Sequence, residues 1–208
     1  YPNSVSELYK YTVTAFNAAE ESMSPVILLS DGYISHLYET IVPHRDFQTK
    51  KRDRQPLGAG NRHFTGLSHE DFVPKTSDVD NYRRLITRLH EKQQLTAQRY
   101  NDYEYFECSK DTDTLLISYG ALSRIAYYFK DTFSLYRPIR MFPVVEEIKI
   151  IAPMYKRIII MEMNTGQYAH EIERILHREV EFIPILGGRI DLVEIKQKIL
   201  EVNHDRRS

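Results

Sequence analysis

An uninterrupted run of large apolar residues, Ile158 to Met161, most constrains how this chain can fold. A strand without polar alternation is typical of a parallel sheet that helices cover on both faces. A short polar turn at residues 164–166 follows the run, and helical spacing of apolar residues then continues to residue 177. Open α/β sheets place their functional surface at the carboxyl ends of their strands, so this turn is the first place where we expect a site.

The alternation of strand and helix extends over residues 112–202. Strands are predicted at residues 113–119, 133–138, 157–163 and 180–186, with a weaker candidate at residues 105–109. Helical patterns follow the four stronger candidates, at residues 120–128, 144–151, 166–177 and 192–200. We expect Thr165 to cap the third helix, and Asp191 with Glu194 to form a capping box at the last one. The order predicts an α/β fold with a doubly wound, mostly parallel sheet.

The first 42 residues contain one helix and one further strand candidate. Apolar residues at helical intervals predict a helix over residues 4–21, with Ser4 and Glu7 as a capping box. The segment PVILLSD at residues 25–31 indicates a buried strand. Because the chain starts at Tyr1 without a methionine and enters a helix at once, we expect a truncated or processed fragment.

The middle of the chain has the character of a connector. Residues 43–75 lose all periodicity and are rich in charge, glycine and proline. Structureless stretches of this length are typical of linkers or functional loops. A helix is predicted after them at about residues 77–100, with Ser77 or Asp78 as its N-cap. We therefore expect a connector over residues 43–104 that contains one helix.

Composition excludes several classes of protein. The longest apolar runs fall far short of the roughly 20 residues that cross a bilayer, so no membrane span is expected. The chain has 28 basic and 29 acidic residues, which gives no general attraction to nucleic acid. Its one cysteine, Cys108, excludes an internal disulfide framework and a cysteine-ligated cluster within this chain. One cysteine also fits a reducing compartment, by default the cytoplasm.

The local motifs do not form a self-contained active site. Gly120 follows a strand candidate but lacks the spaced glycines of a dinucleotide site, so it predicts a tight strand-to-helix turn. His63 and His69 match no common zinc spacing and indicate an ordinary polar loop. The basic run at residues 50–54 is interrupted by Asp53 and indicates a solvated linker. A nucleophile elbow of the hydrolase type is absent from the sequence.

Five segments stand in a recognisable order along the chain. They are SPVILLSDGYISHLYETI, NRHFTGLSHED, DTLLISYGALSR, LYRPIRMFP and IIIMEMNTGQYAHEIER. Together they resemble the alpha subunit of the 2-oxoacid:ferredoxin oxidoreductases, the 2-oxoglutarate type especially, over nearly the whole chain. The most specific parts are TGLSHE at residues 65–70 and EMNTGQ at residues 162–167. The family usually has an acidic residue where Ser68 stands.

The resemblance implies an activity, its cofactors and its partners. The activity is oxidative decarboxylation of a 2-oxoacid, here 2-oxoglutarate, with coenzyme A, which yields an acyl thioester, CO2 and reduced ferredoxin. Thiamine diphosphate and Mg2+ would serve the intact complex, and 4Fe-4S clusters would belong to a partner subunit with the necessary cysteines. The implied partners are a beta subunit, a gamma subunit or domain, and ferredoxin, with neither nucleic acid nor a membrane. The fragment alone is expected to bind no cofactor and to be inactive.

The same resemblance divides the chain and places its site residues. Residues 1–42 would end a pyrimidine-binding thiamine diphosphate domain, and residues 105–203 would form a transketolase C-terminal-like α/β domain beyond the connector. Three residues are then expected to face the cofactor cleft, namely Asp31, Tyr33 and His36. Four turn residues are expected at a subunit interface, namely Asn164, Thr165, Gly166 and Gln167. Neither a catalytic residue nor a metal ligand is expected in this fragment.

Two other interpretations of the residues remain open. The C-terminal sheet could be an independent nucleotide- or flavin-binding module without catalytic activity. Alternatively, the 15 tyrosines could supply the contacts of a structural interaction domain, because tyrosine combines an apolar ring with a polar tip.

Overall fold

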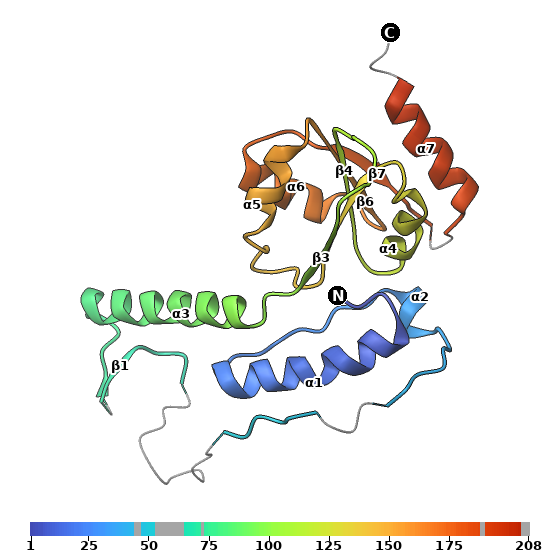
Figure 1. The fold of residues 1–208 in the computed structure, drawn as a ribbon. Coiled ribbons are helices and arrows are strands. Elements are labelled where there is room, and N and C mark those ends of the chain that lie inside the picture. The colour runs from blue at the N-terminus through green and yellow to red at the C-terminus, as the bar shows by residue number, and fades with distance from the viewer. Residues whose placement is uncertain (44–46, 53–64, 72, 188–189, 205–208) are drawn as a thin grey trace.

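The computed structural model describes residues 1–43, 47–52, 65–71, 73–187 and 190–204. In this part of the chain a five-stranded sheet forms the core, and two long helices, α1 (Val5–Ser22) and α3 (Val79–Arg99), lie below it (Figure 1). His63, Asp53 and Arg54, from the predicted polar loop and basic run, lie outside the described residues. Within those residues, no helix combines the length and the apolar character needed to cross a membrane.

The main sheet has the strand order β3-β5-β4-β6-β7. Its strands are β3 (Tyr103–Phe106), β4 (Thr114–Ser118), β5 (Ser134–Pro138), β6 (Arg157–Glu162) and β7 (Glu181–Pro184). The four strands from β5 to β7 are parallel, whereas β3 pairs antiparallel with β5 at the edge. The predicted mostly parallel, doubly wound sheet is confirmed.

Helices cover both faces of the sheet, which explains the unalternating strand sequences. One face carries α5 (Ile148–Ile151) and α6 (Gln167–Leu176), and the other carries α4 (Ala121–Ala126) and α7 (Leu192–His204). Along β4, Ile117 enters the core of the first face and Leu116 that of the second, and both are fully buried. Burying one such side chain stabilises a fold by about 1.5–3 kcal/mol.

Two helices of this domain differ in extent from their predictions. The helix predicted at residues 144–151 is only α5, because the chain from residue 144 forms turns whose valines are already buried against the sheet. A 3-10 turn, η2 (Ala152–Met154), continues it through Pro153. The helix predicted at residues 120–128 is α4 followed by a 3-10 turn, η1 (Tyr127–Phe129).

The N-terminal helices form as their caps predict. Ser4 Oγ accepts the N–H of Glu7 at 3.2 Å at the start of α1. The Glu7 carboxylate accepts the N–H of Asn3, not that of Ser4, so the predicted capping box is only half formed. Asp78 caps α3 by accepting the N–H of Asn81 at 2.9 Å.

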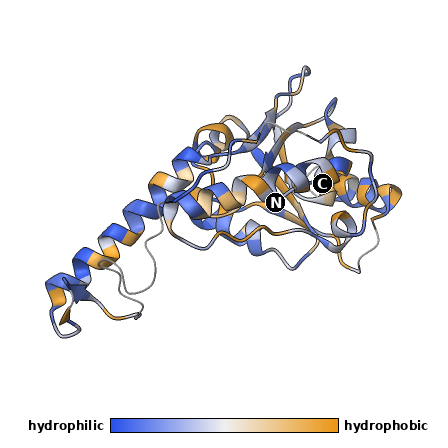
Figure 2. Ribbon diagram, turned by 90° about the horizontal axis from the view of Figure 1, so that it is seen from below, coloured by the Kyte–Doolittle hydropathy of each residue, from blue (hydrophilic) through white to orange (hydrophobic). Residues whose placement is uncertain are grey.

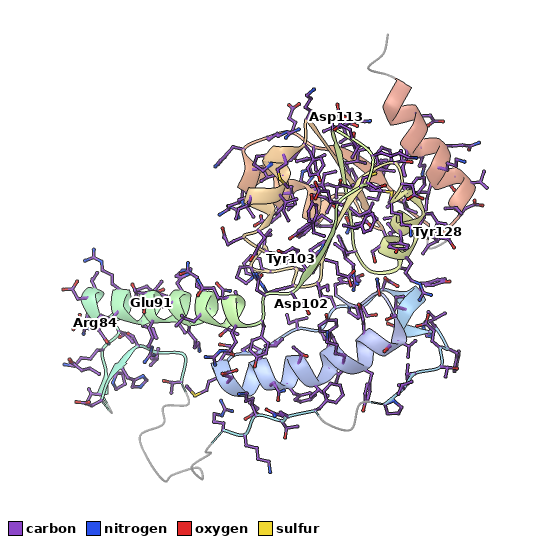
Figure 3. The ribbon with its side chains drawn as sticks, viewed as in Figure 1. Arg84, Glu91, Asp102, Tyr103, Asp113 and Tyr128 are labelled. Carbon is purple, nitrogen blue, oxygen red and sulfur yellow. The ribbon has the colours of Figure 1, made fainter. Side chains whose placement is uncertain are left out.

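The short elements between α1 and α3 are α2 (Gly32–Ser35), β1 (His69–Glu70) and β2 (Val73–Pro74), of which β1 and β2 pair with each other. Helix α3 then projects away from the rest of the molecule (Figure 2). At the opposite end of α3, Asp102 lies where the chain turns into the sheet (Figure 3), and it accepts the Tyr11 hydroxyl of α1 at 2.5 Å.

The predicted buried strand at residues 25–31 is not formed, so this part of the fold prediction is wrong. The segment is irregular, and Ile27 and Leu29 are 80 % and 48 % exposed. Among the described residues, none exchanges a backbone hydrogen bond with residues 25–29. A strand requires a neighbouring strand for its N–H and C=O groups, and the described part of the chain supplies none here.

A buried arginine joins the N-terminal helix to the sheet. Arg137 of β5 binds both Glu7 of α1 and Glu104 of β3, with a 2.9 Å contact to each carboxylate. The Arg137 side chain is 6 % exposed, against 20 % for Glu7 and 60 % for Glu104. Burial acts to raise the pKa of Glu7, but the hydrogen bond and charge of Arg137 outweigh it and hold that pKa below its ordinary value.

Replacing this arginine should strongly destabilise the protein. In Arg137→Ala the Glu7 carboxylate stays partly buried without its cation, so we expect a loss of about 3 kcal/mol in the free energy of unfolding, measured with urea. The matched control is Arg83→Ala, which breaks the exposed pair with Asp80 and should cost less than about 1 kcal/mol.

The loss of unfolding free energy in Arg137→Ala should depend on pH. Because the pKa of Glu7 is lowered on folding, the contribution of this carboxylate to the free energy of unfolding is complete above about pH 5. It is lost as the pH falls through the lowered pKa. The difference in unfolding free energy between Arg137→Ala and the parent chain should shrink in that acidic range. Equal losses in the Arg137 and Arg83 variants would contradict the assigned role of Arg137.

Candidate functional site

The sheet has its topological switch point between β4 and β6. From β4 the chain passes to β5 on one side, whereas from β6 it passes to β7 on the other. Ligand sites of open α/β sheets lie outside the carboxyl ends of strands at such a point. Here residues 118–120, at the end of β4, meet residues 162–168, which run from the end of β6 into α6.

The centre of this site is the carboxylate of Glu162, the last residue of β6, which is 1 % exposed. It accepts the N–H groups of Tyr168 and Ala169 in the first turn of α6, at 3.0 and 2.8 Å. It also accepts the Tyr119 hydroxyl at 2.6 Å. A buried carboxylate at a helix N-terminus is stabilised by such donors and by the helix dipole.

Tyr119 links the two strand ends. Burial, followed by the hydrogen bond to Glu162, raises the pKa of the Tyr119 hydroxyl well above its ordinary value. The hydroxyl therefore keeps its proton, which it donates to Glu162, and it accepts the Asn164 amide at 2.9 Å. Its ring makes edge contacts with Tyr1 and Tyr168, at centroid distances of 4.9 and 5.6 Å.

The turn before α6 is built by Asn164. Its Oδ1 accepts the N–H groups of Gly166 and Gln167 at 2.7 and 3.2 Å. Gly166 has φ +99°, a conformation that other residues rarely adopt. The predicted cap, Thr165, is exposed and is not the capping residue, so that prediction is wrong. The amide of asparagine reaches the backbone two and three residues ahead, which is the geometry this turn requires.

Asp31 closes the site from the N-terminal segment. Its Oδ1 accepts the N–H of Ile34 and its Oδ2 the N–H of Ala121 at the start of α4, both at 2.8 Å. Between the strand and α4, Gly120 has φ +58°, as expected of the predicted tight turn. A Cβ on Gly120 would lie 2.5 Å from Asp31 Oδ2 and 2.6 Å from the ring of Tyr1.

The structure brings together only some of the residues that the sequence singles out. Asp31 and Asn164 lie at the switch point, whereas Tyr33 and His36 are exposed on and beside α2. The cleft-facing role of these side chains and the interface role of the turn stay predictions. Glu162 and Tyr119 were missed as site residues. One signal was available for Glu162, since it is an acidic residue that ends an apolar strand directly before a turn.

The described residues do not assemble a metal site. No group of three or more histidine, cysteine, aspartate or glutamate side chains among them is close enough to share an ion. Cys108 is buried, and its backbone N–H donates to Ser134 Oγ. The polar network at the switch point can fix a surface and orient its side chains.

Substitution of Gly120 tests how tightly the N-terminal segment closes on the sheet. Gly120→Ala combines a strained φ with a clash against Asp31 and Tyr1, so we expect a loss of about 2 kcal/mol of unfolding free energy. Gly32→Ala is the control, because a Cβ there meets no atom within 4 Å. Similar thermal midpoints for the two variants would refute this packing.

Replacement of Glu162 tests the polar network. A glutamine at this position turns an NH2 group toward a donor, so Glu162→Gln should lose about 1–3 kcal/mol of unfolding free energy in urea titration. The control is Glu171→Gln on α6, whose carboxylate pairs with exposed Arg174 and should contribute less than about 1 kcal/mol. If the Glu162 variant loses no more than the control, the carboxylate does not organise the turn.

Known proteins resemble this chain over nearly all of its length. It is 31 % identical over 236 residues to 2-oxoglutarate synthase subunit KorA of Methanothermobacter thermautotrophicus, which covers 97 % of this chain and 62 % of that protein. It is 29 % identical over 212 residues to ketoisovalerate oxidoreductase subunit VorB of Methanothermobacter marburgensis, covering 97 % and 59 % of the two chains. The chain thus spans less than two thirds of the length of these relatives.

A solved structure and a family model agree with these similarities. The fold superimposes with a TM-score of 0.80 on a 2-oxoglutarate:ferredoxin oxidoreductase from Magnetococcus marinus, at 20 % identity, over 96 % of this chain and 41 % of the other. The family model described as "Pyruvate flavodoxin/ferredoxin oxidoreductase, thiamine diP-bdg" matches residues 1–104, half of the 208-residue chain. The chain therefore belongs to the pyruvate flavodoxin/ferredoxin oxidoreductase family that binds thiamine diphosphate.

Proposed function

We propose that this chain is part of the alpha-type subunit of a thiamine diphosphate-dependent 2-oxoacid:ferredoxin oxidoreductase. The complex would decarboxylate a 2-oxoacid, which we assign as 2-oxoglutarate, and transfer the acyl group to coenzyme A while reducing ferredoxin. Support comes from the family match over residues 1–104 and from the KorA relatives, which are 2-oxoglutarate synthase subunits.

One observation carries the proposal that the chain works within a larger assembly. The apolar segment 25–29 lies exposed and unpaired along a cavity of about 820 Å3. Helices α1 and α3 and the loop 139–143 also line this cavity, with both apolar and polar side chains. An exposed apolar segment beside a cavity is typical of a surface that another protein covers.

The described residues do not fit a complete cofactor site. Asp31, the predicted cleft-facing carboxylate, already accepts two backbone N–H groups, and no cluster of metal-ligating side chains accompanies it among the described residues. We therefore assign this chain to the walls and the framework of the site. Thiamine diphosphate and Mg2+ would be held in the intact complex and the 4Fe-4S clusters by a partner subunit, in the cytoplasm.

The turn before α6 is the proposed contact with a beta subunit. Asn164 is occupied within the turn, because its amide binds Tyr119 and two backbone N–H groups. The side chains of Thr165 and Gln167 are exposed next to it. We assign Asn164 to holding the turn, and Thr165 and Gln167 to contacting the partner, which could include a gamma subunit or domain.

The interface is tested in the intact complex. The double variant Thr165→Ala, Gln167→Ala should weaken association with the beta subunit about tenfold, measured by sedimentation of the purified subunits, because it removes exposed polar contacts without disturbing Asn164. Lys149→Ala on α5, also exposed, is the control and should associate normally. Unchanged association of the double variant would remove this turn from the interface.

The assignment to an assembly has its own test. The isolated chain supplied with thiamine diphosphate, Mg2+, coenzyme A and 2-oxoglutarate should not reduce ferredoxin, whereas the intact complex should. Ferredoxin reduction by the isolated chain would overturn the proposed division of roles. Failure of the intact complex with every 2-oxoacid would overturn the activity itself.

A further inference from the structure

Residues 31–39 form a strap that runs across the start of α4 and the start of α1. Helix α2 is part of this strap and lies beside both helices (Figure 1). The backbone hydrogen bonds of the strap stay inside it, as in the bond from the N–H of Ser35 to the carbonyl of Asp31. In the described part of the chain, the strap backbone forms no hydrogen bond to the backbone of the sheet, α1 or α4. Side chains must therefore hold the strap in place.

Two carboxylates anchor the strap, one at each end. Asp31 Oδ2 accepts the N–H of Ala121, the first residue of α4, at 2.8 Å. Glu39 accepts the N–H of Val5, the first residue of α1, at 2.9 Å, and it also accepts the guanidinium of Arg124 at 2.6 Å. Both N–H groups belong to first helical residues, which have no acceptor within their own helix. Each of these two amides therefore reports on one end of the strap.

Little apolar surface of the strap is buried between these anchors. Ile34 is the one buried residue of the strap, at 1 % exposed, whereas Tyr33 and Tyr38 are 51 % and 98 % exposed. Neither hydrophobic core of the sheet contains a residue of the strap. The pair of Glu39 with Arg124 has side chains that are 25 % and 41 % exposed, and such exposed ion pairs contribute little. A segment with few buried apolar contacts opens at a lower free energy than the strands of a core.

We propose that residues 31–39 open and close over α4 as one unit while α1 and the sheet stay folded. Opening releases the N–H groups of Ala121 and Val5 together, because opposite ends of the same strap hold them. It also moves Tyr33 and His36, which lie on and beside α2. In the complex proposed above, closure of the strap would set the position of these two side chains, and only this consequence rests on the proposed function.

Amide hydrogen exchange of the isotope-labelled 208-residue chain, followed by NMR, measures this opening. The amides of Val5 and Ala121 should have similar protection factors, at least about 100-fold below those of Ile159 and Ile160 in β6. Protection of Val5 and Ala121 equal to that of the β6 amides would mean that the strap opens only when the whole chain unfolds, which would overturn the proposal. The measurement involves no oxidoreductase activity, so this failure would leave the proposed function standing.

Variants test whether the two ends of the strap move together. Asp31→Ala removes the anchor of Ala121 and should also speed exchange of the Val5 amide, at the other end, about tenfold. Ile34→Ala removes the buried contact and should speed exchange of both amides at least about tenfold. Tyr38→Ala is the control on the strap itself and should change neither amide, because Tyr38 is almost fully exposed. Unchanged protection of the β6 amides verifies that each variant is folded. If Asp31→Ala speeds exchange at Ala121 alone, the ends move independently and the strap is not one unit.

Discussion

The buried carboxylate of Glu162 is the interaction on which the switch-point surface depends. A charge at the end of a strand covered on both faces must be compensated locally, and two N–H groups of α6 and the Tyr119 hydroxyl do this. The position of Tyr119 then fixes the Asn164 amide, whose oxygen holds the backbone of the turn. One carboxylate thus determines where α6 begins and which way the turn faces.

A second carboxylate attaches the N-terminal segment by the same chemistry. Asp31 accepts the first N–H of α4 as Glu162 accepts those of α6, so neighbouring strand ends are each closed by an acidic side chain. Arg137 of β5 provides a second attachment, because it binds Glu7 of α1. These contacts join residues about 90 and 130 positions apart, and they explain why the first helix and the sheet form one unit although, among the described residues, no strand connects them.

The sequence predicts what local patterns determine. The strands β4 and β6 were predictable because burial on both faces leaves an unbroken apolar run, and α1 and α3 because their caps and apolar spacing are local. The segment 25–31 has the same apolar signal, but a strand also needs a neighbour that the pattern does not reveal. Glu162 and Arg137 escaped prediction because their partners are backbone groups in a later helix or carboxylates more than 30 residues away. Asn164 was passed over for Thr165 because either residue can cap a helix.

In the proposed assembly, the exposed segment 25–29 would also link the stability of this chain to its partner. Helices of the same domain already cover both faces of the sheet, so the apolar side chains of segment 25–29 are not buried against it. Covering a side chain such as Ile27 completely would contribute about 1.5–3 kcal/mol, and pairing the backbone would replace its hydrogen bonds to water by hydrogen bonds to protein. A partner that supplies both therefore stabilises the N-terminal half more than the C-terminal sheet. Since Asp31 ends this segment and holds the first N–H of α4, a partner bound to the segment would lie next to the carboxylate that closes the switch point.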